Sequence, residues 1–127
     1  MPTVYVQIPG APNTTAPSPV PIPGLGLDIP AGAGEQAVII LNVPQAFAEG
    51  ANFPGGWFGL SVDGAMLHLS VRFRGLADSP KSRYYTPCTL VAAVPLKLKA
   101  QKVQAMWNAE TGSTVGLGAS SLTVMVD

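Results

Sequence analysis

The sequence predicts an all-β protein, most economically a jelly-roll β-sandwich, and three observations lead to this prediction. Short apolar runs separated by turn residues recur at spacings of about 8 to 12 residues, which is typical of sandwiches. Apolar residues nowhere recur at i, i+3, i+4 and i+7 over successive helical turns. The 127-residue chain also contains 14 glycines and 13 prolines, which would interrupt long helices.

The first 21 residues are expected to form a proline-rich N-terminal arm ahead of the jelly-roll domain, which covers residues 22–127. Eight of the 13 prolines lie among the first 30 residues, a spacing that excludes a helix and suits an extended chain. Apolar residues alternate with polar or aromatic ones over Thr3–Ile8, so this segment is predicted to pair as an edge strand. A flexible linker is the alternative.

The next predicted strands come in order along the chain. A second apolar element, Leu25–Ile29, precedes a glycine-rich turn. The β-branched and aliphatic residues of Gln36–Val43 predict a buried strand that stops at Pro44. The dipeptide Asp63-Gly64 predicts a type I′ hairpin, because both central residues of that turn need a positive φ. The two arms of this hairpin are expected at Gly56–Val62 and Ala65–Arg74.

Apolar and polar side chains alternate along the second arm of the hairpin, which predicts that one face lies on the core. The apolar positions are Leu67, Leu69, Val71 and Phe73. After a loop over residues 75–87, further strands are predicted at Thr89–Val94, Leu96–Lys99, Lys102–Asn108 and Ser121–Val126.

Charge is scarce in this chain. Charged residues make up 11% of it, against about 25% in ordinary soluble domains, so part of the outer surface is expected to be covered by self-association. A formal net charge of zero gives no electrostatic attraction for nucleic acid. The best apolar run, Ala37–Val43, is far shorter than the about 18 residues of a transmembrane helix, so no transmembrane segment is expected. The N-terminus also lacks the pattern of a secretory signal, which predicts a cytoplasmic protein or release by a non-classical route.

Residues for catalysis or metal binding are thinly spread. The single cysteine, Cys88, excludes an internal disulfide and a cysteine-based zinc site. The single histidine, His68, lies on a predicted strand without a nucleophile motif, so a hydrolase using it is a minor alternative. The carboxylates are scattered along the sequence, so no metal site and no cofactor are expected. The chain is therefore predicted not to be an enzyme.

One tryptophan is a candidate for binding. The run Gly55-Gly56-Trp57-Phe58-Gly59 surrounds Trp57 with residues that lack bulk, which can leave an indole face open for stacking. Packing in the core is the alternative for Trp57, and it is the preferred interpretation for Phe58 and for Trp107.

A second group of candidates lies on the polar face of the hairpin and in the loop that follows it. The run Ser82-Arg83-Tyr84-Tyr85-Thr86 contains a cation, two phenols and two hydroxyls, a composition suited to binding a neutral polyol. An ordinary solvated loop is the alternative. Arg72 and Arg74 project from one face of their strand, which in a chain with so few charges suggests an interface or a ligand.

These residues bring the chain close to a known family. It resembles the tumour-necrosis-factor-like lectin domain family, found at the N-terminus of a two-domain Burkholderia soluble lectin. The resemblance runs from about Ile22 to Met125 and rests on five short motifs in order. They are Ile22-Pro23-Gly24-Leu25 with Leu27-Asp28, Ile40-Leu41-Asn42-Val43-Pro44, Asn52-Phe53-Pro54-Gly55, Thr89-Leu90-Val91-Ala92, and Trp107 with Gly112-Ser113.

The resemblance implies a jelly roll that assembles as a trimer, with calcium-independent sites for fucosylated glycans between neighbouring protomers. Phe47 and Trp57 stand where the family lectin has sugar-contacting tyrosines, and Ser82 matches a sugar-contacting serine. Five further positions differ from the family pattern. Arg83 replaces a threonine, Tyr85 an arginine, Arg74 with Gly75 a threonine and a tyrosine, and Thr111 the arginine that holds fucose.

The sequence therefore predicts a non-catalytic lectin whose partners are glycans, fucosylated or of another monosaccharide class. A hydroxyl at Thr111 cannot reproduce the donor geometry of an arginine, and Arg74 or Arg83 offers a replacement donor from another direction. The expected carbohydrate-binding residues are Phe47, Trp57, Arg74, Ser82, Arg83, Tyr85 and Thr111. The alternative function is a structural or adhesive jelly-roll trimer without a sugar site.

Overall fold

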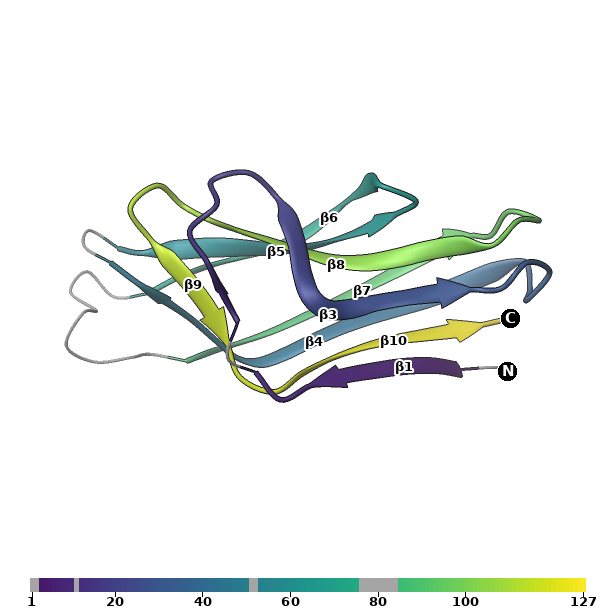
Figure 1. Cartoon of the computed structure of the whole chain (residues 1–127), viewed down its shortest axis with the longest axis horizontal. Coiled ribbons are helices and arrows are strands. Elements are labelled where there is room, and N and C mark those ends of the chain that lie inside the picture. Colours follow the sequence, from purple (N-terminus) through teal and green to yellow (C-terminus); the bar gives the residue numbers. More distant parts are fainter. Residues whose placement is uncertain (1–2, 11, 51–52, 76–84) are drawn as a thin grey trace.

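The structure is a computed structural model that describes residues 3–10, 12–50, 53–75 and 85–127. These residues form a sandwich of two antiparallel β-sheets (Figure 1). The strands are β1 (Thr3–Ile8), β2 (Asn13–Thr14), β3 (Val20–Ile29), β4 (Gln36–Glu49), β5 (Gly55–Val62), β6 (Ala65–Arg74), β7 (Thr86–Pro95), β8 (Gln101–Ala109), β9 (Thr114–Leu117) and β10 (Ser120–Val126). Among the described residues, no helix is long and apolar enough to cross a membrane.

The connectivity confirms the predicted all-β jelly-roll sandwich. Sheet A has the order β1-β10-β4-β9-β2, with β7 on the other side of β4, and sheet B has the order β3-β8-β5-β6. The chain crosses repeatedly between the sheets, from β4 in sheet A to β5 in sheet B and from β6 back to β7. The prediction of an edge strand at Thr3–Ile8 is confirmed, because β1 pairs with β10 from Thr3 opposite Met125 to Ile8 opposite Ser120.

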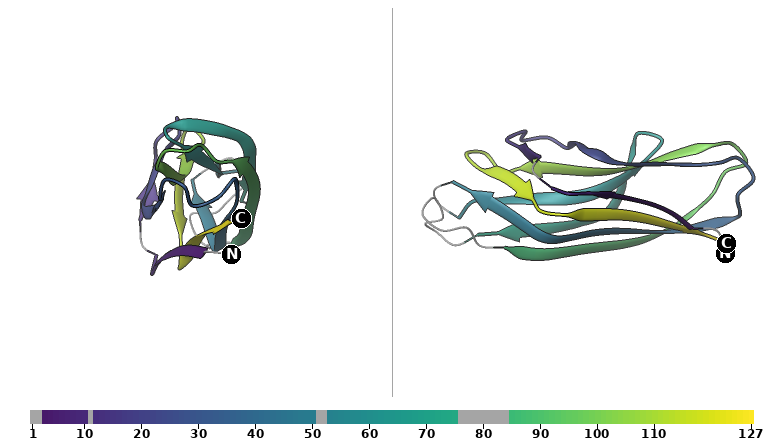
Figure 2. Two further views of the ribbon diagram at one scale, coloured as in Figure 1. Left: turned by 90° about the vertical axis from the view of Figure 1, so that its right-hand side faces the viewer. Right: turned by 60° about the horizontal axis from the view of Figure 1, so that its bottom comes forward.

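The two ends of the sandwich differ. Both chain termini lie at one end, where β1 and β10 run side by side (Figure 2). We call the opposite end the loop end. There β4 and β6 finish, β5 and β7 begin, and the turn between β8 and β9 lies (Figure 1).

Strand β4 does not stop at Pro44, and this prediction was wrong. The strand runs to Glu49, and its pairing register shifts between Val43 and Ala46. Proline cannot donate a hydrogen bond to the ladder, so it is tolerated at such a bulge, where the ladder is already interrupted. Before the bulge β4 pairs with β10 and β7, and after it Ala46–Glu49 pairs with β9.

The bulge also reverses which side chains of β4 face the core. Up to Val43 the odd-numbered residues are buried, whereas Ala46 and Ala48 are buried after it. Side chains alternate with a period of two, so one inserted step turns Phe47 and Glu49 to the outer face of sheet A. Without the bulge, Phe47 would point into the core.

The predicted hairpin is confirmed, but its second arm is less buried than the alternation indicated. Asp63 and Gly64 have φ values of 51° and 82°, as a type I′ turn requires. Of the four apolar positions of β6, Phe73 is buried, whereas Leu69 is 52% exposed. The reason is that β6 is the edge strand of sheet B, where the sandwich is open on one side.

The strand predicted at Leu96–Lys99 is wrong. These residues form the connection between β7 and β8, and the Leu98 side chain is 92% exposed. Their backbone is satisfied by other groups: the Leu96 amide donates to the Glu35 carbonyl at 2.8 Å, and the Lys97 amide donates to Gln101 Oε1 at 2.8 Å. The sequence analysis also missed two short strands, β2 and β9.

The core lies between the sheets and contains the two aromatic residues that were predicted there. Phe58 and Trp107 are each 1% exposed, and their ring centroids lie 6.3 Å apart. Phe73 stacks on Phe58, with the two ring centroids 5.5 Å apart. This packing accounts for three of the largest side chains in sheet B and leaves Trp57, the neighbour of Phe58, on the outer face.

Candidate functional site

A hollow of about 290 Å³ lies on the outer face of sheet A at the loop end, and we call it the sheet A hollow. It is lined by residues from several elements, namely Asn13, Gln45, Phe47, Glu49, Tyr85, Thr114, Leu117 and Gly118. The lining combines two aromatic rings with amide, carboxylate and hydroxyl groups. Such a mixture suits a small polar ligand that also has an apolar face.

The two rings of the sheet A hollow meet at a right angle. Phe47 and Tyr85 have centroids 5.8 Å apart and an interplanar angle of 84°, an edge-to-face contact. Phe47 lies opposite Gly116 in the register, and a Cβ added at Gly116 would overlap the Phe47 ring. Because Gly116 has no side chain, the Phe47 ring can lie flat over β9. Tyr85 is 51% exposed.

A second group of residues lies on the outer face of sheet B, and we call it the sheet B cluster. It consists of Trp57, Arg72, Arg74, Asn108 and Glu110. Trp57 on β5 lies directly between Arg72 on β6 and Asn108 on β8 in the register. Its ring extends along the strand over Gly59, where an added Cβ would stand 2.6 Å from the ring. The indole is therefore held flat against the sheet and half-buried.

An ion pair forms the polar side of the sheet B cluster. Arg74 Nη2 lies 3.2 Å from Glu110 Oε2 and 3.4 Å from Oε1. Backbone hydrogen bonds hold Glu110 in reach: its amide donates to the Gly55 carbonyl at 3.0 Å, and Gly55 lies opposite Arg74 in the register. The pair is largely exposed, so its contribution to stability is small, and its main effect is to neutralise one arginine.

The predicted binding residues divide between these two places. Phe47 and Tyr85 lie together in the sheet A hollow, and Trp57 and Arg74 lie in the sheet B cluster. Thr111 is exposed in the turn after β8, next in sequence to Glu110. Ser82 and Arg83 lie outside the described residues.

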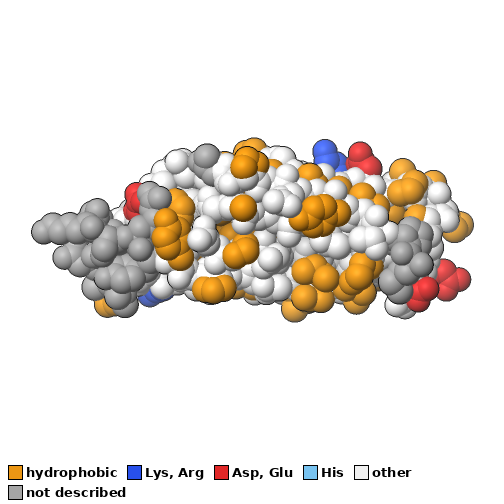
Figure 3. Space-filling model, turned by 90° about the horizontal axis from the view of Figure 1, so that it is seen from below, with side chains coloured by type: hydrophobic (Ala, Val, Ile, Leu, Met, Phe, Trp, Pro, Cys, Tyr) orange, Lys and Arg blue, Asp and Glu red, His pale blue; other side chains and the backbone are white. Residues whose placement is uncertain are grey.

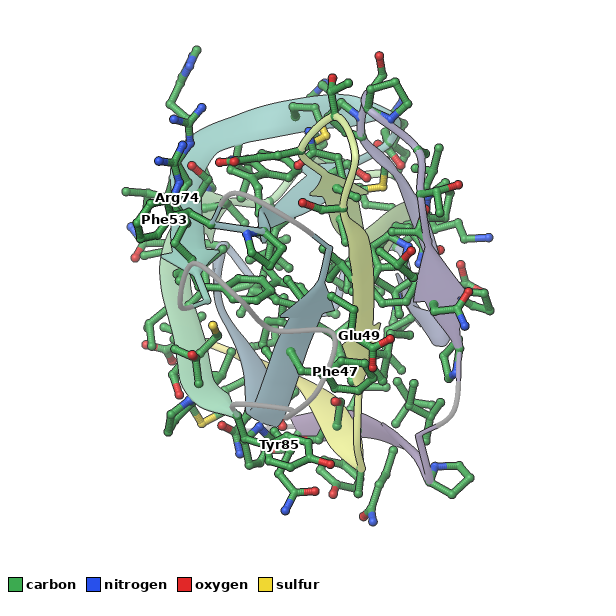
Figure 4. All side chains as sticks on the ribbon, turned by 90° about the vertical axis from the view of Figure 1, so that its left-hand side faces the viewer. Phe47, Glu49, Phe53, Arg74 and Tyr85 are labelled. Atoms are coloured by element: carbon green, nitrogen blue, oxygen red, sulfur yellow. The ribbon has the colours of Figure 1, made fainter. Side chains whose placement is uncertain are left out.

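The two groups are at the same end of the molecule but on opposite sides of it. Figure 4 views the loop end and shows Phe47, Glu49 and Tyr85 on one side and Arg74 with Phe53 on the other. The core separates them, so within one chain they do not form a single site.

Sequence reasoning missed several polar residues at both places. In the sheet A hollow these are Asn13, Gln45, Glu49 and Thr114, and in the sheet B cluster they are Asn108 and Glu110. The signal that could have located both places is an aromatic side chain that lies over a glycine on the outer face, as Phe47 does over Gly116 and Trp57 over Gly59. Finding it for Phe47 requires the register of β9, a strand that the pattern did not predict.

The described residues do not support the minor alternative of a hydrolase. Cys88 is buried in sheet A, and burial raises the pKa of its thiol to about 11, which keeps it protonated and unreactive. His68 is exposed on β6, in the other sheet. Within the described ranges, no three His, Cys, Asp or Glu side chains lie close enough together to hold a metal ion.

Comparison with known families identifies the kind of domain that this fold and these outer-face clusters represent. A family model described as the N-terminal domain of Bc2l-C matches residues 5–124. The chain belongs to this family, the tumour-necrosis-factor-like lectin domains that the sequence resembles. Membership points to a carbohydrate-binding protein rather than an enzyme.

Two solved structures were compared with the chain, and the first of them shares its fold. The chain is 15% identical to dimeric latent PorU from Porphyromonas gingivalis with a TM-score of 0.56, and the match covers 98% of this chain and 12% of that one. A family 35 carbohydrate-binding module from Clostridium thermocellum is 10% identical with a TM-score of 0.47, and the match covers 100% of both chains. The PorU likeness bears on the fold alone. The comparison with curated proteins finds no match.

We predict that Gly116→Ala destabilises the fold through the Phe47 ring. The added methyl group must displace the ring, at a cost of about 1–3 kcal/mol in the free energy of unfolding. The same substitution in a Phe47→Ala background should cost much less, because nothing remains to be displaced. Urea unfolding of the four proteins, followed by circular dichroism, measures the difference. An equal cost in both backgrounds would contradict the contact.

Proposed function

We propose that this chain is a non-catalytic, calcium-independent lectin domain that works as a homotrimer, with one glycan site in each seam between protomers. The observation that carries the proposal is the division of the aromatic and polar residues into two groups at one end of a lectin-family domain. The sheet A hollow of one protomer and the sheet B cluster of its neighbour are two halves of one site.

The two halves complement each other chemically. A sugar ring has an apolar face of C–H groups and an edge of hydroxyls, so it needs an aromatic surface and hydrogen-bonding groups on different sides. Trp57 offers an indole face and Arg74 a fixed guanidinium. Phe47 and Tyr85 offer a second aromatic wall, and Glu49 is a polar group of the same hollow.

The outer face of sheet A supports a seam between copies of the chain. Across β1, β10, β4 and β7 the outward residues lie in register as three rows. The rows are Thr3, Met125, Val38 and Ala93; Tyr5, Thr123, Ile40 and Val91; and Gln7, Ser121, Asn42 and Thr89. None of these residues is charged. Figure 3 shows this face, where charged side chains appear only toward the rim of the part that is not grey.

The open side of the sandwich supplies a surface for this face to cover. Leu69 on β6 is 52% exposed, and a hollow of about 410 Å³ on this side is lined mainly by apolar residues of β5, β6 and β7. Packing the flat face of one copy against the open side of the next is a heterologous contact, and such contacts form a ring when the rotation between copies closes. A ring of three matches the assembly that the family resemblance implies.

Each glycan site is expected to be weak by itself. A small sugar buries little surface, so a dissociation constant on the order of micromolar to millimolar is expected per site. Three sites on one particle strengthen attachment to a surface that carries many glycans.

A glycan array followed by titration calorimetry tests the function. We expect binding that is unchanged by EDTA, since the proposed site contains no metal. Trp57→Ala should weaken binding about tenfold or more, because the stacking of a sugar ring on the indole contributes directly to the binding free energy. Lys102→Ala, a control at an exposed position of β8 at the far end of sheet B, should leave it unchanged. A trimer that binds no sugar at millimolar concentration would instead support the structural or adhesive alternative.

Co-expression of two defective variants tests whether the site is shared. Phe47→Ala and Trp57→Ala proteins should each bind poorly as homotrimers. Mixed trimers should regain binding, with about a quarter of all seams intact if protomers assemble at random, because an intact seam needs each residue from a different protomer. Calorimetry on the mixture gives the number of restored sites. If both residues served a site within one chain, mixing would restore nothing.

A charge placed on the outer face of sheet A should dissociate the trimer. Val91→Glu puts a carboxylate into the proposed seam, where burial without a partner is costly. Light scattering at micromolar concentration should show a trimer for the unmodified chain and a monomer for this variant, with circular dichroism unchanged. Ala31→Glu is the control, because Ala31 is exposed in the turn between β3 and β4 and belongs neither to this face nor to the open side. A monomeric unmodified chain, or a trimeric Val91→Glu variant, would contradict the seam.

A further inference from the structure

The sheet B cluster contains one arginine that is neutralised and one that is not. Arg72 and Arg74 both project outward from β6 and are exposed. Arg74 is paired with Glu110 at 3.2 Å. The Arg72 guanidinium makes no ion pair and no hydrogen bond with the residues that the structure describes. Two arginines against one carboxylate leave the cluster with a formal charge of +1, centred on Arg72.

Arg72 lies beside the aromatic surface of the cluster. It is the direct cross-strand partner of Trp57, so the Cβ atoms of the two residues are about 5 Å apart. Two hollows, of about 110 and 290 Å³, adjoin here, and both are lined by Arg72 and Glu110. Trp57 and Asn108 line the smaller of them. A ligand on the indole would therefore reach the free guanidinium.

The Asn108 side chain is held in place beside the indole. Its Nδ2 donates to the Pro17 carbonyl at 3.0 Å, which sets the orientation of the side-chain amide. Its Oδ1 atom is buried below the surface, so this oxygen does not face a ligand on the outer face. Asn108 therefore lines the smaller hollow, and the ligand-facing groups of that hollow are Trp57 and Arg72.

From these observations we infer that the sheet B cluster selects acidic saccharides. The sugar ring stacks on Trp57, and a carboxylate or sulfate of the same glycan pairs with Arg72. Arginine suits this role because its planar fork of donors matches a carboxylate or a sulfate. Within the sheet B cluster, Glu110 does not repel the anion, since Arg74 neutralises it. The inference rests on the proposed lectin function and specifies the ligand class of that site.

Calorimetry with three related probes tests the inference: lactose, 3′-sialyllactose and lactose 3′-sulfate. The two acidic probes should bind about tenfold more tightly than lactose at low salt, because a charge-assisted hydrogen bond adds to the stacking. This preference should shrink at about 0.5 M salt, which screens exposed charges. Comparison of the sialylated and sulfated probes tells which anion fits Arg72 better.

Two variants localise the effect. Arg72→Gln should reduce the preference for the acidic probes to less than about twofold, since the paired charge is gone. Lys102→Gln should retain it, because Lys102 is an exposed cation on the same face of sheet B at the opposite end. The quenching or shift of Trp57 fluorescence on binding gives a second readout, which a Trp57→Phe variant should lose.

The outcomes separate this inference from the proposed function. Neutral glycans that bind without any advantage for their acidic counterparts would overturn the inference and leave the lectin function standing. An acidic preference that survives Arg72→Gln would also overturn it. An array on which no glycan binds would remove both.

Discussion

The structure depends on one constraint of a two-layer sandwich. Outward side chains of one sheet and outward side chains of the other lie on opposite faces of the molecule. Packed sheets stand about 10 Å apart, and the core between them is filled here by Phe58, Phe73 and Trp107. An aromatic residue on the outside of sheet A therefore cannot meet one on the outside of sheet B within one chain. A site built from both would need two chains, so binding at such a site would depend on assembly.

The bulge of β4 at Pro44 decides which residues of this strand reach the outer face of sheet A. It makes one strand serve two neighbours, β10 before the bulge and β9 after it. It also exchanges the inner and outer positions, which brings small alanines into the core and Phe47 to the surface. A proline often ends a central strand. In β4 it lies at the bulge, where the side chains that follow switch between the inner and the outer face of the sheet.

Much of the fold follows from local patterns in the sequence, whereas the arrangement of the candidate site does not. The hairpin at Asp63-Gly64 follows from backbone geometry, because few residue pairs accept two positive φ angles. The segment Leu96–Lys99 was predicted as a strand because its residues alternate, but four residues are too few to distinguish a strand from a turn. Glu49 and Asn108 could not be assigned to a site, since their positions depend on a bulge and on long-range register that periodicity does not contain.

The pairing of β1 with β10 has a practical consequence for how the molecule is presented. It brings the first and last described residues together at the end remote from both clusters. A fluorophore, bead or fused protein attached at either terminus would therefore stand clear of the loop end. Immobilised through such a tether, the domain would expose the sheet A hollow and the sheet B cluster to the medium.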